Sequence, residues 1–319
     1  MTGPGTAGIA AAPAAAPEIR ITAHVFEWVH RAPCAALRRA LGGLTLLRGP
    51  ESALTVALPW GTVVAAGPGG DGTVGLHSMN RHADAFTADR EGLAAAPAAG
   101  TVPSWAVPAV TALLAHPGPA AGVRMVVNQE LPVGMGLLTG AETERAAALT
   151  LADLYGRAEA VPDGAERDPS YAASLHAREG HAMLVAGGAV RHLPCDLASA
   201  GLRLMIIDVG LGGEGGARPS ASTVPADLVE RAEKVLRAGD PGGLGPLLTE
   251  GHVPGEPLLD GALDAARSAG ALGGLTVGRC GLALVPMAAV ADVRARVAER
   301  TAGRARRRPR FLTVVPSGV

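Results

Sequence analysis

The sequence predicts an α+β fold, because its strand-like and helix-like segments do not alternate in the regular order of a doubly wound parallel sheet. A strand pattern over 52–66, a turn rich in glycine and proline, and a second strand pattern over 73–78 together predict a β-hairpin. Further along, a short strand over 123–127 leads through a glycine-containing loop at 131–140 into a helical segment at 141–155. Hairpin and crossover units within one chain are typical of α+β proteins.

The predicted helices are delimited by capping and breaking residues. A helix is predicted over 103–115, with Pro103 at its start. Thr139 and Glu142 have the spacing of a capping box for the next helix, and Gly156 is placed to end it. The segments predicted beyond it are a polar loop at 156–170, helices at 171–184, 225–240, 257–271 and 288–303, strands at 203–209, 281–287 and 310–316, and a glycine-rich loop at 210–222.

Length and composition exclude several classes of protein. The chain has 319 residues, which corresponds to two domains of roughly 150 residues each. Hydrophobic residues make up 48%, charged residues 18%, and the net charge is -1, which excludes a charge-rich disordered chain and argues against a basic nucleic-acid-binding protein. Apolar runs are broken by glycine, proline or charge before they reach membrane-spanning length, so no membrane partner is expected.

The N-terminus and the cysteines indicate a cytoplasmic protein. Residues 1–18 are rich in alanine, proline and glycine and predict a disordered tail without the pattern of a signal peptide. Cys34, Cys195 and Cys280 are odd in number and lack metal-ligand spacing, which predicts neither a disulfide framework nor a zinc site. Lys234 is the only lysine, so any mechanism that requires a catalytic lysine has one candidate.

The loop PVGMGLLTGAETE at 132–144 resembles the second motif of the GHMP small-molecule kinases. The wider context resembles galactokinase, because RAP at 31–33, SLHAREGHAML at 174–184 and PRFLTVVPS at 309–317 match that family in order, and the likeness extends over 26–319. The resemblance implies a domain like the second domain of ribosomal protein S5 at 19–197 and a ferredoxin-like domain at 198–319. It also implies phosphoryl transfer from ATP, with Mg²⁺, to the anomeric hydroxyl of galactose.

Several candidate cofactor residues follow from the resemblance. A phosphate needs unhindered backbone N–H groups near the N-terminus of a helix, and the glycines of this loop permit that approach. The family serines are replaced, and only Thr139 keeps a hydroxyl, so Thr139 and Glu142 are the candidate metal ligands. The alternative is an inherited turn kept for packing. The candidate nucleotide-binding residues are Pro132, Gly134, Gly136, Thr139 and Gly140.

The sugar-binding motif and the third glycine motif depart from the family pattern. Arg31, in the matching RAP, is the candidate substrate-binding residue, but Ala35 stands where the family has its second arginine and no Glu-His-x-Asp cluster follows. Arg38 and Arg39 are interpreted as solvated surface charges. The third motif, at 275–286, is shortened and keeps few of its glycines.

The family base falls on Ser170, whose hydroxyl is a weak base, with Asp168 as the fallback. The predicted function is therefore a galactokinase-like protein that has lost most or all phosphotransfer and keeps at most nucleotide or small-ligand binding or a regulatory role. An active kinase for a different small substrate, with a relocated carboxylate base, is one alternative, and a structural partner protein is another. The basic run at 304–310 is interpreted as a solvated loop, and no nucleic-acid partner is expected. The oligomeric state is left open.

Overall fold

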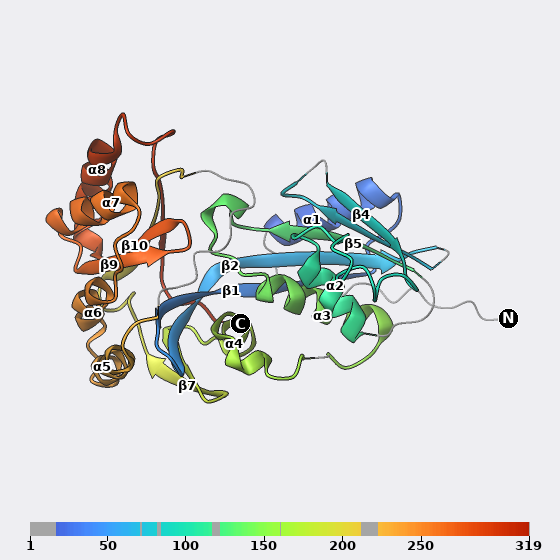
Figure 1. The fold of residues 1–319 in the computed structure, drawn as a ribbon, viewed down its shortest axis with the longest axis horizontal. Helices are drawn as coiled ribbons and strands as arrows, with labels where there is room; N and C mark the ends of the chain where they lie inside the picture. Colours follow the sequence, from blue (N-terminus) through green and yellow to red (C-terminus); the bar gives the residue numbers. More distant parts are fainter. Residues whose placement is uncertain are drawn as a thin grey trace.

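The computed structural model describes residues 17–70, 72–81, 84–116, 122–159, 161–211 and 223–318. Within this part of the chain, one sheet has seven strands and a second has four, and helices cover both (Figure 1). The path of the first sheet is β4-β3-β5-β2-β6-β7, with β1 paired to β2, and the path of the second is β11-β8-β10-β9. The protein therefore has the α+β architecture that its sequence predicts.

The first sheet and its helices occupy the N-terminal part of the chain. Their bounds are α1 (Pro17–His30), β1 (Ala36–Arg48), β2 (Ser52–Pro68), β3 (Thr73–Ser78), β4 (Ala85–Asp89), α2 (Val107–Ala115), β5 (Val123–Gln129), η1 (Val133–Met135), α3 (Ala141–Tyr155), η2 (Ala165–Arg167), α4 (Pro169–His176), β6 (His181–Ala186) and β7 (Ala189–Pro194).

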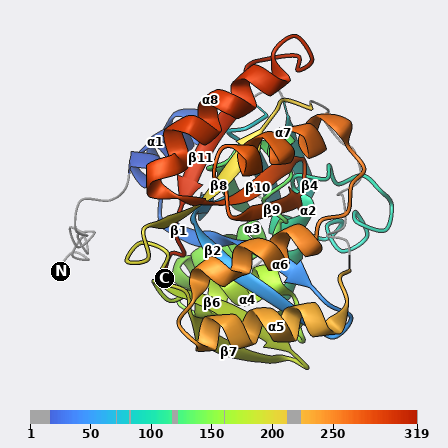
Figure 2. The ribbon, with the colours of Figure 1, turned by 90° about the vertical axis from the view of Figure 1, so that its left-hand side faces the viewer.

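The second sheet and its helices follow. Their bounds are β8 (Leu202–Asp208), α5 (Ala226–Arg237), η3 (Pro241–Gly243), α6 (Leu244–Glu250), α7 (Pro257–Ser268), β9 (Gly273–Val277), β10 (Cys280–Pro286), η4 (Met287–Ala289), α8 (Val290–Thr301) and β11 (Arg310–Val314). Figure 2 looks onto these helices, with α7 and α8 above and α5 and α6 below, beside β7.

Strand β2 organises the first sheet. It pairs with β1 along most of its length, while its other edge is shared by β6 at Ser52–Thr55 and by β5 at Thr62–Pro68. Its nearly continuous run of buried apolar residues is typical of a strand covered on both faces. Between the segments paired with β6 and β5, the Ala57 carbonyl accepts a hydrogen bond from Ser317 N (3.0 Å), so the chain end returns to the first sheet.

One apolar core joins the two sheets. Alternate residues of a strand face opposite sides, and in β8 Met205 and Ile207 pack with α7 and α8 while Leu204 and Ile206 enter a core that also contains Leu54. The domain division at 197–198 falls between β7 and β8 and stays a prediction. No helix in the described ranges combines the length and the apolar character needed to cross a membrane.

Several predicted elements are confirmed, and their bounds agree within a few residues. Helix α3 covers the predicted 141–155, and α5, α7 and α8 fall within the three helices predicted in the C-terminal part. The strands predicted at 203–209, 281–287 and 310–316 correspond to β8, β10 and β11. These elements carry their own periodicity and breakers, which is why local sequence was sufficient.

Three expectations are wrong. Strand β2 does not form a hairpin with β3, because β2 pairs with β1, β5 and β6, whereas β3 pairs with β4 and β5. The helix predicted at 171–184 is α4 followed by β6, since the turn at Gly180 (φ 66°) interrupts it. The expected tail is too long, because Pro17 begins α1; its other residues, 1–16, lie outside the described residues, as does most of the 210–222 loop.

Candidate functional site: the loop between β5 and α3

The loop between β5 and α3 is packed into the protein by its own apolar side chains. Met135 and Leu137 are 3% and 4% exposed and belong to the core that joins the two sheets. The β9–β10 turn lies directly on the loop, since Arg279 N donates to the Met135 carbonyl (3.0 Å). A Cβ on Gly278, whose φ is +59°, would lie 2.6 Å from the Gly136 carbonyl oxygen. The loop and the turn are therefore in backbone contact.

Glu142 occupies the N–H groups at the start of α3. Its side chain is fully buried, and its carboxylate accepts hydrogen bonds from Gly140 N (2.9 Å), Thr139 N (3.3 Å) and Thr139 Oγ1 (3.4 Å). The predicted capping box is correct in that Glu142 reaches back, but the N-cap position is Gly140, in the left-handed region, and not Thr139. Two of the backbone donors that could approach a phosphate here, Thr139 N and Gly140 N, are already bonded to an internal carboxylate.

Glu142 should make stability depend on pH. Burial raises the pKa of this carboxyl, although its hydrogen bonds oppose the shift. A carboxyl with a raised folded pKa contributes stability below the unfolded pKa, and that contribution is lost as pH rises through the folded pKa. Glu142→Gln keeps an acceptor oxygen and cannot ionise, so it should gain stability relative to the parent protein as pH rises above about 4.3. Urea unfolding from acid to neutral pH measures this.

The control for that experiment has the opposite sign. The hydrogen bond from Arg231 lowers the pKa of Glu250 on the surface, so Glu250→Gln should lose stability relative to the parent as pH rises. A parallel response of the two variants would contradict the role assigned to the buried Glu142 carboxyl.

The position of the family base lies against β1 in apolar surroundings. Ser170 is 3% exposed, and a Cβ on Gly43 would lie 2.7 Å from its Cα. When the family pattern is counted without gaps from RAP, its Glu, His and Asp fall on Leu41, Gly42 and Leu44. Both leucines are buried. The structure thus brings the predicted base position and the first motif together, with no polar side chain between them at these positions.

Asp168 holds the start of α4. Its carboxylate accepts from Ser170 N (2.8 Å), which makes it the N-cap, and its own side chain is solvent-exposed. The pKa of Glu144, in the first turn of α3, is raised by burial and then by the charge of Asp168. Two carboxylates therefore face the gap between the starts of α3 and α4.

A half-buried polar cluster continues from these carboxylates. Burial, followed by the charges of Glu144 and Glu159, raises the pKa of Tyr171 to about 12. Arg145 and Glu159 form an ion pair of 3.5 Å. Within the described residues, three buried polar atoms of the cluster have no hydrogen-bond partner, namely Tyr171 Oη, Arg145 Nη1 and Glu159 Oε1. The sequence alone does not predict this cluster, because Arg145 and Glu159 belong to no recognisable motif.

The arginines of the first motif have structural partners. Arg31 lies at the end of α1, where its guanidinium stacks 5.9 Å from the centroid of the Trp28 ring. Arg38 forms an exposed pair with Asp153 (2.6 Å), as its interpretation as a surface charge implies. Arg39 corrects that interpretation, because its half-buried guanidinium binds both oxygens of the buried Glu130 (2.9 and 2.7 Å).

Across the described ranges, no group of three or more His, Cys, Asp or Glu side chains is arranged to hold a metal ion. The proposal that Thr139 and Glu142 bind Mg²⁺ stays a prediction, and Glu142 is engaged by the backbone at the start of α3. A phosphate bound at this loop would have to share the N–H groups of Thr139 and Gly140 with the Glu142 carboxylate.

The sequence of the chain resembles that of a galactokinase. No family model matches it. It is 29% identical over 336 aligned positions to the galactokinase of Streptomyces coelicolor (strain ATCC BAA-471 / A3(2) / M145), covering 82% of this chain and 86% of the relative. The crystal structure of Lactococcus lactis galactokinase complexed with galactose matches with a TM-score of 0.75 and 16% identity, over 94% of this chain and 98% of that one.

Other small-molecule kinases share the fold. A mevalonate kinase matches with a TM-score of 0.58 and 10% identity, over 87% of this chain and 98% of that one. The chain is a galactokinase-like protein with the GHMP kinase fold. The homoserine kinase of Cytophaga hutchinsonii matches the galactokinase-like chain with a TM-score of 0.55 and 15% identity, over 89% and 94% of the two chains. The recognition from motif order is thereby confirmed.

Proposed function

We propose that this galactokinase-like protein has lost phosphoryl transfer to galactose and acts by binding a small ligand. The observation that carries the proposal is the buried Glu142 carboxylate, which takes the hydrogen bonds of Thr139 N and Gly140 N. A bound phosphate would have to compete with a carboxylate that is covalently part of the same helix and already in place. The contact between Met135 and the β9–β10 turn further restricts the space above the loop.

The replaced sugar-binding positions support the same proposal. Recognition of a sugar requires fixed donors and acceptors, because an unpaired polar group in a closed site loses its hydration without compensation. Leu41 and Leu44 offer none, and Gly43 packs on Ser170. The hydroxyl of Ser170 is also too weak a base to accept a proton from a sugar. Each loss removes a separate contribution to the rate, so together they should reduce it by orders of magnitude.

The test is an ADP-release assay with Mg-ATP and galactose. We expect a rate no higher than that measured without galactose, because neither the base nor the sugar-binding groups of the family are present. The Streptomyces coelicolor galactokinase serves as the positive control under the same conditions. Galactose-dependent release of ADP by the pure protein would overturn the proposal.

A second candidate is a kinase for another small molecule that uses Asp168 as its base. The pair formed by Asp168 and Glu144 favours it, since these carboxylates lie next to the family base position. Asp168→Asn distinguishes the two functions, because asparagine still caps α4 but accepts no proton. If a substrate panel reveals turnover, this variant should abolish it under the second candidate.

A further inference from the structure

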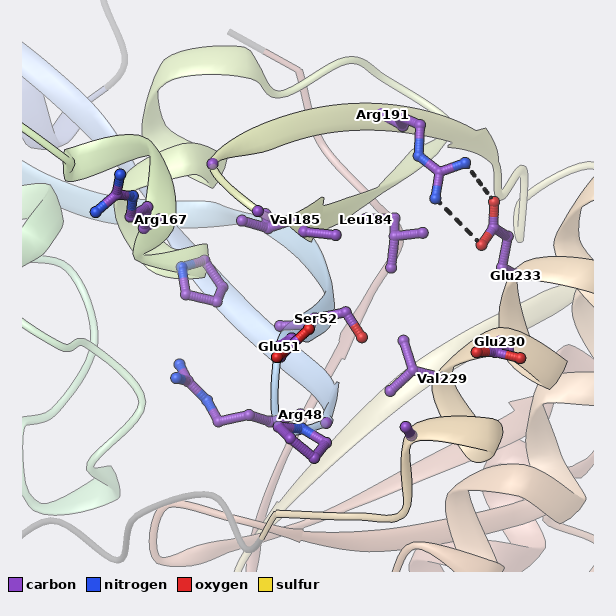
Figure 3. A pocket seen from close by; sticks show the side chains of 18 of the residues that line it. Arg48, Glu51, Ser52, Arg167, Leu184, Val185, Arg191, Val229, Glu230 and Glu233 are labelled. Carbon is purple, nitrogen blue, oxygen red and sulfur yellow. Dashed lines mark hydrogen bonds and ion pairs between the residues drawn. The ribbon is translucent and has the colours of Figure 1, made fainter.

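A cleft of about 1070 Å³ lies apart from the residues of the β5–α3 loop, and Figure 3 shows the side chains that line it. Four separate segments meet around it: the β1–β2 turn, the start of α4, the β6–β7 hairpin and α5. None of the residues 131–140 lines it. Ligand pockets commonly enclose about 300–1,000 Å³, so the cleft is large enough for a metabolite with room for water.

Cationic side chains outnumber anionic ones in the lining of the cleft. Five basic residues face three glutamates, which leaves a net charge of +2. Glu233 is neutralised within the cleft, because it pairs with Arg191 (2.7 Å) and Arg237 (2.8 Å). Arg48, Arg167 and Lys234 form no hydrogen bond or ion pair through their side chains within the described part of the chain. Three cations on three different elements therefore retain their full capacity to bind an anion.

The charges are distributed unevenly across the cleft. Figure 3 shows Arg48 and Arg167 on one side, and Glu230 with the Arg191–Glu233 pair on the other. Hydroxyl and carboxylate groups of Ser52 and Glu51 lie between the two sides. A ligand that spans the cleft would thus meet the guanidinium groups of Arg48 and Arg167 at one end, and at the other the Glu230 carboxylate beside the neutralised Arg191–Glu233 pair.

The backbone of Arg48 and the side chain of Arg167 are held by contacts with neighbouring segments. Arg48 ends β1, and its carbonyl accepts a hydrogen bond from Val224 N (2.8 Å) just before α5. Arg167 lies across the β6–β7 turn, where a Cβ on Gly188 would be 3.7 Å from its Cγ. Leu184 and Val229 contribute apolar surface between the charged groups. The site is therefore held by packing contacts on both sides.

We propose that this cleft binds the phosphate monoester of a polyhydroxylated small molecule. The forked guanidinium groups of Arg48 and Arg167 suit the oxygens of a phosphate, and Lys234, on α5, adds to the positive charge of the lining. Ser52, Glu51 and Glu230 can accept hydrogen bonds from hydroxyl groups of the ligand body. The inference does not depend on the loss of phosphoryl transfer, since the cleft lies outside the β5–α3 loop.

Isothermal titration calorimetry of the full chain at low salt tests this site. The probes are glucose 6-phosphate, glycerol 3-phosphate and adenosine 5′-monophosphate, with glucose and inorganic phosphate as comparison ligands. We expect at least one monoester to bind more tightly than either comparison ligand. Arg48→Gln and Arg167→Gln should each weaken that binding at least about tenfold, since each removes a charge-assisted hydrogen bond. Arg20→Gln, on the exposed face of α1, removes the same charge and should leave affinity unchanged.

Each contrary result has a distinct meaning. No heat with any monoester overturns the site. If inorganic phosphate binds as tightly as every monoester, the proposal that the cleft recognises a hydroxylated ligand body is overturned. If Arg20→Gln weakens the affinity as much as Arg48→Gln and Arg167→Gln do, the effect is one of general charge, and the assignment to these two arginines is overturned. Melting temperatures measured without ligand verify that the variants are folded. Binding here without galactose-dependent ADP release leaves both proposals standing, whereas binding together with ADP release overturns only the loss of phosphoryl transfer.

Discussion

Glu130→Ala is expected to lower the free energy of unfolding by about 3–5 kcal/mol, the cost of removing one partner of a buried ion pair. The Glu130 side chain is 2% exposed and binds Arg39 through both oxygens. One of those oxygens also accepts from Gly61 N (2.6 Å). Alanine would leave the half-buried Arg39 guanidinium with only the Pro59 carbonyl as an acceptor, and it would remove the carboxylate acceptor of Gly61 N. Urea unfolding of parent and variant measures the difference.

The matched control is an ion pair on the surface. Glu250 binds Arg231 through both oxygens at 2.7 and 2.8 Å, yet its side chain is 51% exposed. Exposed pairs contribute about 1 kcal/mol or less, so Glu250→Ala should have a much smaller effect. Similar losses for the two variants would show that burial does not set the energy of the Glu130 pair.

Gly61→Ala is expected to destabilise the protein by about 3 kcal/mol, at the upper end of the usual cost of overpacking. A Cβ at this position would lie 1.8 Å from the Ala40 carbonyl oxygen, in the neighbouring strand. The clash is with backbone, so no side-chain rotation relieves it. Strands β1 and β2 would have to separate where their register already shifts, between Leu41 and Gly43. Thermal and urea unfolding both report the loss.

Gly75→Ala is the matched control for Gly61→Ala. Gly75 also lies within a strand, β3, but a Cβ there meets no atom within 4 Å. Alanine loses less backbone freedom on folding than glycine does, so this variant should be neutral or stabilising by up to about 1 kcal/mol. A Gly61→Ala variant as stable as Gly75→Ala would contradict the close approach of β1 and β2.

Gly61 and Glu130 hold each other through two hydrogen bonds next to the candidate site, and this pair is called the clamp. Glu130 follows β5 directly and precedes the loop that leads to α3. The Glu130 backbone N–H donates a hydrogen bond to the Gly61 carbonyl (2.9 Å), and the Glu130 carboxylate accepts one from Gly61 N. The clamp therefore sets where the loop leaves the sheet. Its loss should disturb the loop as well as the stability of the fold.

The helices of the C-terminal part could be predicted because their signals are local. Helix α5 follows Pro225 and has an amphipathic pattern, with Leu228, Ala232 and Leu236 buried on one face. Proline also begins α7 and glycine ends α3, so capping chemistry marked these limits. Such interactions join residues within about one or two helical turns, and a single sequence displays them.

The pairing of the strands could not be read in the same way. The turn between β2 and β3 has the composition of a hairpin turn, yet β5, far along the chain, pairs with both strands. Arg39 likewise meets Glu130, 91 positions away, instead of solvent. The competition between such partners is decided by which packing buries the most apolar surface, and the order of residues does not display it.

For the candidate site too, some features could be predicted from the sequence and others depend on the tertiary structure. The order of motifs alone identified the kinase fold, and it predicts that the position of the family base falls on Ser170. The capping-box spacing also predicted that Glu142 reaches back to the backbone of its own loop, but only the folded chain gathered Arg48, Arg167 and Lys234 around one cleft. The sequence determines which chemistry is possible at each position, because a side chain's functional group is fixed by the identity of its own residue. The partners of each group depend on distances in space between segments far apart in the chain, and packing of the two sheets creates those distances.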